Sequence, residues 1–212
     1  MKILLKLASY LLHPLWMPFA GSLFYFLFTP RFFPREIIEA KLLAIAIITI
    51  FIPIVFYFLL KNLGKAGTIF LDEVGERKWP LFFFILLSAM VLNQILNIYN
   101  YPALFYYFAG ILFSTIIAYI FTWLKIKVSL HMVGISGLLM FIIGFCIYFH
   151  LYFIYSISFL IIATGLSASS RLYYKAHTKW ELFLGFITGL IPQLIMFSFW
   201  FREYRMSDLF LG

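Results

Sequence analysis

The sequence predicts an all-α integral membrane protein, a bundle of six or seven transmembrane helices with a polar site at one membrane face. Of its 212 residues, 65% are hydrophobic and 11% are charged. A membrane-spanning helix needs about 20 apolar residues, and the apolar runs of this chain reach that length without the alternation of barrel strands. These runs take up nearly the whole sequence, so we expect a single transmembrane domain over residues 1–212.

Seven apolar runs are the candidate spans. They cover residues 7–28, 37–60, 81–98, 103–124, 132–148, 151–168 and 182–200. The first is the least regular, because Pro14 and Pro18 interrupt its helical hydrogen bonding, and counting it or not gives seven spans or six. The sequence Tyr-Asn-Tyr-Pro at 99–102 predicts a tight turn. In the fifth run, the glycines at 134, 137 and 144 are expected to be helix-packing positions.

The charge pattern points to lipid rather than to nucleic acid. The formal net charge is +8, but the cations lie at the ends of apolar runs, where they bind headgroups and set orientation. Most of the 16 Lys and Arg residues fall on the face expected to hold the polar site, which by the positive-inside rule favours the cytoplasmic side for that face. The single cysteine, Cys146, lies in an apolar run and forms no internal disulfide.

Two helical hairpins are expected to return three polar segments to one face of the membrane, residues 72–80, 127–131 and 170–181. His177 and Glu181 are four residues apart, so on a helix beginning near His177 they share a face, and the carboxylate could hold and polarise the imidazole. The convergent set comprises Arg77, Lys78, Lys127, Ser129, His131, Ser170, Arg171, His177 and Glu181.

This set of residue types suits a phosphate ester of a lipid. Several cations at headgroup depth form a clamp for phosphate, and two histidines allow one to attack while the other donates a proton. Taken singly, a cation at a span end such as Lys127 is better explained as a topology anchor, and each histidine is as well explained as an interfacial residue. His150 is expected to be structural, and His13 either lines the site or accompanies the distortion at Pro14. Neither a metal nor another cofactor is expected, since zinc needs three or four close ligands.

The motifs resemble a known family. In one run, Ser170 and Arg171 are followed after five residues by His177 and after three more by Glu181. This run resembles the third signature, S-R-x5-H-x3-D, of the type 2 phosphatidic acid phosphatase superfamily. The run 129–131, Ser-Leu-His, is similar to the second signature, P-S-G-H, with Val128 in place of proline and leucine in place of glycine. Residues 76–80 are a weaker likeness of the first, K-x6-R-P, and the phosphatase-like core would cover residues 72–200.

The resemblance implies a role for each residue. His177 would be the nucleophile that forms a phosphohistidine, Glu181 would orient it, and His131 would be the general acid for the leaving lipid oxygen. The implied phosphate ligands are Arg171, Arg77, Lys78, Ser129 and Ser170.

The implied activity is metal-independent hydrolysis of a lipid phosphomonoester or diphosphate in a bacterial inner membrane. Bacterial members commonly face the periplasm, opposite to the side that the charge pattern favours. The alternative function is that of a non-enzymatic membrane protein, or a subunit of a complex, that binds anionic lipid headgroups.

Overall fold

The computed structural model describes residues 2–68, 71 and 73–211, without the side chains of Leu4 and of residues 203–211. Asp72, where the expected phosphatase-like core begins, lies outside the described residues. In the described part every regular element is helical: α1 (Lys2–Leu11), η1 (Pro14–Trp16), α2 (Met17–Phe28), α3 (Arg35–Ala46), η2 (Ile47–Phe51), α4 (Ile52–Asn62), η3 (Gly75–Arg77), α5 (Lys78–Met90), η4 (Val91–Ile95), α6 (Pro102–Trp123), α7 (Leu130–Phe149), α8 (Ile154–Tyr173) and α9 (Lys179–Leu211).

Five of the described helical segments are long and apolar enough to cross a membrane. They are Arg35–Asn62, Gly75–Ile95, Pro102–Trp123, Leu130–Phe149 and Lys179–Arg202. A sixth is reached if α1 and the η1–α2 segment form one span bent by 42°. The expected span at 151–168 corresponds to α8, which is not among the five. Serines at 156, 158, 167, 169 and 170, with Arg171, make α8 more polar than its neighbours. These apolar helices indicate a membrane protein.

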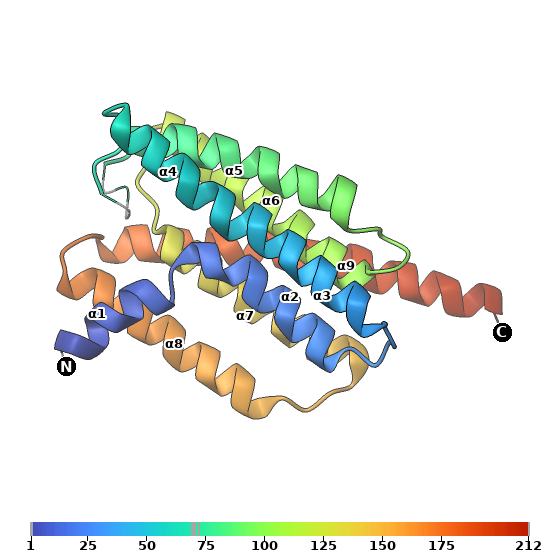
Figure 1. Cartoon of the computed structure of the whole chain (residues 1–212). Helices are drawn as coiled ribbons and strands as arrows, with labels where there is room; N and C mark the ends of the chain where they lie inside the picture. Colours follow the sequence, from blue (N-terminus) through green and yellow to red (C-terminus); the bar gives the residue numbers. More distant parts are fainter. Residues whose placement is uncertain (1, 69–70, 72, 212) are drawn as a thin grey trace.

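The helices run up and down, so alternate connections gather at the same end of the bundle. At the left-hand end of Figure 1, the loop after α4, the α6–α7 loop and the α8–α9 loop come together with α1. The three predicted polar segments lie in or beside these loops. The Tyr-Asn-Tyr-Pro turn lies at the other end, between η4 and α6, as predicted. His150, also at that end, closes α7 with a left-handed backbone conformation, φ 53°.

α7 is the central helix, with α2, α6, α8 and α9 packed around it. α9 approaches it closely through Gly185 and Gly189, where a Cβ atom would lie 2.5 Å from the Ser129 carbonyl oxygen and 2.1 Å from that of Val133. Such spacing of small residues lets two helices in a membrane touch backbone to backbone. Two of the predicted packing glycines, 137 and 144, face α9, and the third, 134, faces Pro14 and Met17.

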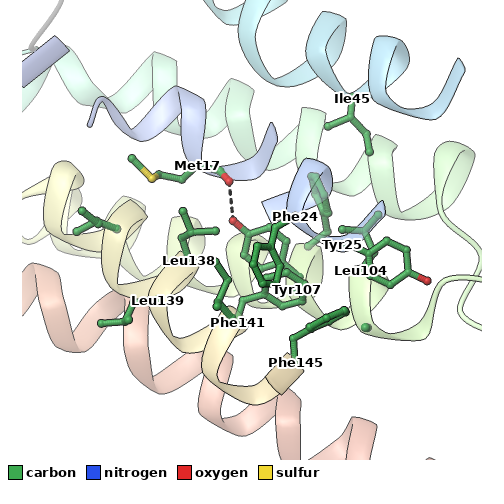
Figure 2. Close-up of a cluster of buried hydrophobic side chains, with 14 of the residues drawn as sticks. Met17, Phe24, Tyr25, Ile45, Leu104, Tyr107, Leu138, Leu139, Phe141 and Phe145 are labelled. Carbon is green, nitrogen blue, oxygen red and sulfur yellow. Dashed lines mark hydrogen bonds between the residues drawn. The ribbon is translucent and has the colours of Figure 1, made fainter. Parts of the chain in front are cut away.

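An aromatic cluster fills the junction of α2, α6 and α7 (Figure 2). The Tyr107 ring stacks on Phe141 with 4.2 Å between ring centroids. Its hydroxyl donates a hydrogen bond of 2.7 Å to the carbonyl oxygen of Met17, the first residue of α2. Gly21 makes room for the ring, because a Cβ there would lie 2.4 Å from it. Tyr107 thereby fixes the position at which α2 begins after the break in the N-terminal pair.

Candidate functional site

The local sequence at the start of α9 places His177 and Glu181 together. Thr178 and Glu181 form a capping box, in which each backbone N–H donates to the other's side-chain oxygen, both at 3.3 Å. The same carboxylate oxygen, Oε2, accepts a hydrogen bond of 2.7 Å from Nδ1 of His177. Glu181 therefore closes the helix start and orients the imidazole ring, as the four-residue spacing predicted.

The pair determines the protonation state of His177. A carboxylate only accepts hydrogen bonds, so the proton of the neutral ring lies on Nδ1 and Nε2 keeps its lone pair. The His177 side chain is 7% exposed. The pKa of His177 is lowered to about 4, first by burial and then by the positive charges of Arg77 and Lys127, while the hydrogen bond and the charge of Glu181 act in the opposite direction. His177 is thus neutral at neutral pH, which leaves Nε2 able to act as a nucleophile or base.

Arg77 joins the first polar segment to the second. It ends η3 and is buried, and its Nη1 donates 2.6 Å to the carbonyl oxygen of Val128 while its Nε donates 2.8 Å to that of Leu71. The positive charge of Arg77 lowers the pKa of His177. Lys78, the next residue, points elsewhere: its ammonium lies 4.0 Å from the centroid of the Trp123 ring, a cation–π contact. Of these two predicted phosphate ligands, Arg77 is the one beside His177.

Ser129 stands at the N-terminus of α7, fully buried, and is held against α9. Its backbone N–H donates to the carbonyl oxygen of Glu181 at 3.1 Å, an approach that Gly185 makes possible. Its Oγ is buried and has no hydrogen-bond partner among the described residues. A buried hydroxyl in that state is costly, and here it lies at a helix N-terminus, where the peptide dipoles favour an anion.

α1 covers the remaining predicted residues. Arg171 Nη2 donates to the hydroxyl of Ser9, and the Ser170 hydroxyl lies 2.7 Å from the same oxygen. Ser170 also donates to the carbonyl oxygen of Leu5 at 2.8 Å. His131 Nε2, which must carry the proton because its partner is a carbonyl, donates 3.1 Å to the backbone oxygen of Ser9. One turn of α1 thus occupies the polar groups of Ser170, Arg171 and His131.

The predicted residues therefore form two adjacent clusters. His177, Glu181 and Arg77 lie at the loops, and His131, Ser170 and Arg171 lie under α1. His131 is close enough to both Arg171 and His177 to interact with them electrostatically. His13 adds an edge-to-face ring contact with His131, 5.3 Å between centroids.

Sequence reasoning missed two residues of this region. Thr178 could have been found, because Thr-x-x-Glu before an apolar run is the pattern of a capping box. Ser9 carried no such signal, since it is a lone hydroxyl inside an apolar stretch. Within the part of the chain that the structure describes, no group of three or more His, Cys, Asp and Glu side chains could hold a metal ion.

No family model, curated protein or solved structure matches the chain.

Proposed function

We propose that the chain is a membrane-embedded phosphatase that hydrolyses a lipid phosphomonoester or diphosphate through a phosphohistidine, by the mechanism of the type 2 phosphatidic acid phosphatases that its motifs resemble. The observation that carries the proposal is the His177–Glu181 pair. The pair holds Nδ1 at 2.7 Å from a carboxylate and leaves Nε2 unprotonated beside Arg77.

In the proposed reaction, Nε2 of His177 attacks phosphorus and the bond to the lipid oxygen breaks. His131 gives a proton to that oxygen. Glu181 stabilises the positive charge that develops on the His177 ring, while Arg77, Arg171 and the Ser129 hydroxyl hold the phosphoryl oxygens, whose charge such a transfer must stabilise. Water then cleaves the phosphohistidine and releases phosphate.

One observation favours the alternative of a non-enzymatic protein that binds anionic headgroups. Ser9 of α1 takes a hydrogen bond from Arg171 and another from His131, so the proposed acid and one proposed phosphate ligand already have internal partners. Arg77 has internal partners as well, the carbonyl oxygens of Leu71 and Val128.

Phosphate release separates the two functions. The purified chain in detergent would be incubated with phosphatidic acid, phosphatidylglycerol phosphate, a polyprenyl diphosphate and a lipid A phosphate, with and without vanadate. We expect release from at least one lipid, inhibition by vanadate and loss of release in His177→Ala. A matched control is His150→Asn at the opposite end of α7, where asparagine tolerates the left-handed backbone. Binding of these lipids without turnover by any of them would refute the enzymatic proposal.

A further inference from the structure

Lys127 is a cation of the candidate region that the proposed reaction does not use. It lies in the loop between α6 and α7, at the end of the bundle where the polar segments gather. Two hydrogen bonds hold this loop in place. The carbonyl oxygen of Val128, the next residue, accepts 2.6 Å from Arg77 Nη1, and the N–H of Ser129 donates 3.1 Å to the carbonyl oxygen of Glu181. Lys127 is therefore fixed between the buried arginine and the start of α9.

The charge of Lys127 acts on the proposed nucleophile, because it is one of the two positive charges that lower the pKa of His177. Two other cations of the region are engaged inside the protein: Arg171 donates to a hydroxyl of α1, and Lys78 lies over an aromatic ring. No described residue forms an ion pair, a side-chain hydrogen bond or a cation–π contact with Lys127, which is partly buried. A positive charge in this situation favours an anionic group beside it.

A second observation concerns the leaving group. The proposed acid, His131, is buried, and its Nε2 proton is directed at the carbonyl oxygen of Ser9, 3.1 Å away. An aliphatic alcohol is about as weak an acid as water, whose pKa is about 15.7, so its oxygen leaves phosphorus with difficulty unless an acid protonates it. A phosphate monoester has a second pKa of about 6 and leaves as an anion. A site whose acid is engaged therefore suits a diphosphate, in which the leaving group is a lipid phosphate.

We propose that Lys127 binds the lipid-linked phosphate of a diphosphate substrate, and that the site prefers lipid diphosphates to lipid monophosphates. This proposal rests on the proposed function, because it uses the same nucleophile. It adds a ligand for the second phosphate, which a monophosphate lacks. It also removes the need for a proton from His131, because the charge on the leaving oxygen is stabilised by the Lys127 ammonium instead.

The reaction proceeds in two steps. Nε2 of His177 attacks the terminal phosphorus, and the bond between this phosphorus and the bridging oxygen breaks. The electron pair of that bond stays on the bridging oxygen, which leaves unprotonated as part of the lipid phosphate. Water then attacks the phosphohistidine, the N–P bond breaks with its electron pair returning to Nε2, and one proton of the water passes to solvent. The products are the lipid monophosphate and inorganic phosphate.

Two lipids that differ only in the leaving group measure the preference. The purified full chain in detergent would be incubated with hexadecyl diphosphate and with hexadecyl phosphate, and the products would be measured by mass spectrometry. We expect kcat/KM for the diphosphate to exceed that for the monophosphate roughly 100-fold or more, because general acid catalysis of alcohol release contributes about that much. The diphosphate should release one phosphate per lipid, and hexadecyl phosphate should accumulate.

Two lysines of the same loop form a matched pair of variants. Lys127→Met removes the charge and keeps most of the side-chain length, and Lys125→Met does the same at an exposed position. Lys127→Met should lower kcat/KM for hexadecyl diphosphate roughly 10–100-fold, the effect of one hydrogen bond between charged groups, and so reduce the preference for the diphosphate. Lys125→Met should change neither value. Both variants should retain their helical circular dichroism.

The outcomes separate this proposal from the proposed function. Release of phosphate from neither lipid would overturn the proposed function and this proposal with it. Release at similar kcat/KM from both lipids would overturn the preference for diphosphates alone. An unchanged preference in Lys127→Met would overturn the assignment of Lys127 as the ligand of the second phosphate.

Discussion

The contact between α7 and α9 makes a quantitative prediction for Gly189→Ala. A methyl group at this position would lie 2.1 Å from the Val133 carbonyl oxygen and 2.2 Å from Ser136 Oγ. The obstacle is backbone, so relief requires the two helices to separate by about 1 Å. Overpacking of this kind costs about 1–3 kcal/mol, and the better helix propensity of alanine returns at most about 1 kcal/mol. Because the backbone cannot move aside as a side chain can, we take the upper limit of about 3 kcal/mol for the overpacking, which leaves a net loss of about 2 kcal/mol.

Thermal unfolding in detergent measures the effect. A loss of about 2 kcal/mol lowers Tm by roughly 4–8 °C for a chain of this length. Gly165→Ala is the control, because a Cβ there meets nothing within 4 Å and the same propensity gain should leave Tm equal or slightly higher. Gly137→Ala, whose Cβ would lie at an ordinary 3.7 Å from the Gly189 carbonyl oxygen, should fall between them. Equal Tm values for the three variants would refute the close packing of α7 on α9.

Three further predictions concern the candidate site. The pKa of His177 is about 4 when folded and about 6.5 when unfolded, so its contribution to stability is complete above pH 6.5. As the pH falls toward 4 the unfolding free energy should decrease by at most about 1.4 kcal/mol per pH unit. His177→Gln should remove that part of the pH profile, and an unchanged profile would contradict the shift. Glu181→Gln keeps a residue that can cap the helix but removes the carboxylate. Phosphate release should therefore fall roughly 100-fold or more, and Tm should change little. Unchanged release would show that Glu181 serves only to cap the start of α9. Ser9→Ala leaves Arg171 without the Ser9 hydroxyl and should cost about 1–3 kcal/mol, whereas Ser198→Ala, an exposed hydroxyl bonded within its own helix, should cost almost nothing. Equal Tm values for these two serine variants would argue against the docking of α1.

Apolar run length predicted the helices and the end at which the polar loops gather. It could not predict the distortion of the N-terminal pair in detail, because the position of α2 depends on a hydrogen bond from Tyr107, a residue 90 positions from Met17. The pairing of Gly185 and Gly189 with α7 is likewise a tertiary contact. A small-residue spacing indicates that a helix packs closely, but not which helix it packs against.

Local spacing was the reliable guide to the site. The predicted contact between His177 and Glu181 is present, but His177 lies two residues before α9 and not on its face; the capping box at Thr178 and Glu181 brings the two side chains together, and no distant contact is needed to place them. Lys78 shows the opposite case. Its position beside Arg77 suggested a phosphate ligand, but on a helix successive side chains diverge by about 100°, and Lys78 lies over Trp123.

The docking of α1 limits how the proposed hydrolysis could proceed. A lipid oxygen leaving phosphorus must accept a proton, yet the Nε2 proton of His131 is directed at the Ser9 carbonyl oxygen. Arg171 likewise donates to Ser9. A phosphoryl group held between Arg171 and His177 would therefore compete with Ser9 for the same donors, and a charged oxygen makes stronger hydrogen bonds than a hydroxyl. The bend of 42° beside Pro14 sets α1 at an angle to the η1–α2 segment, and α1 packs mainly against α8, so a displacement of α1 that frees Arg171 and His131 would have to break its contacts with α8.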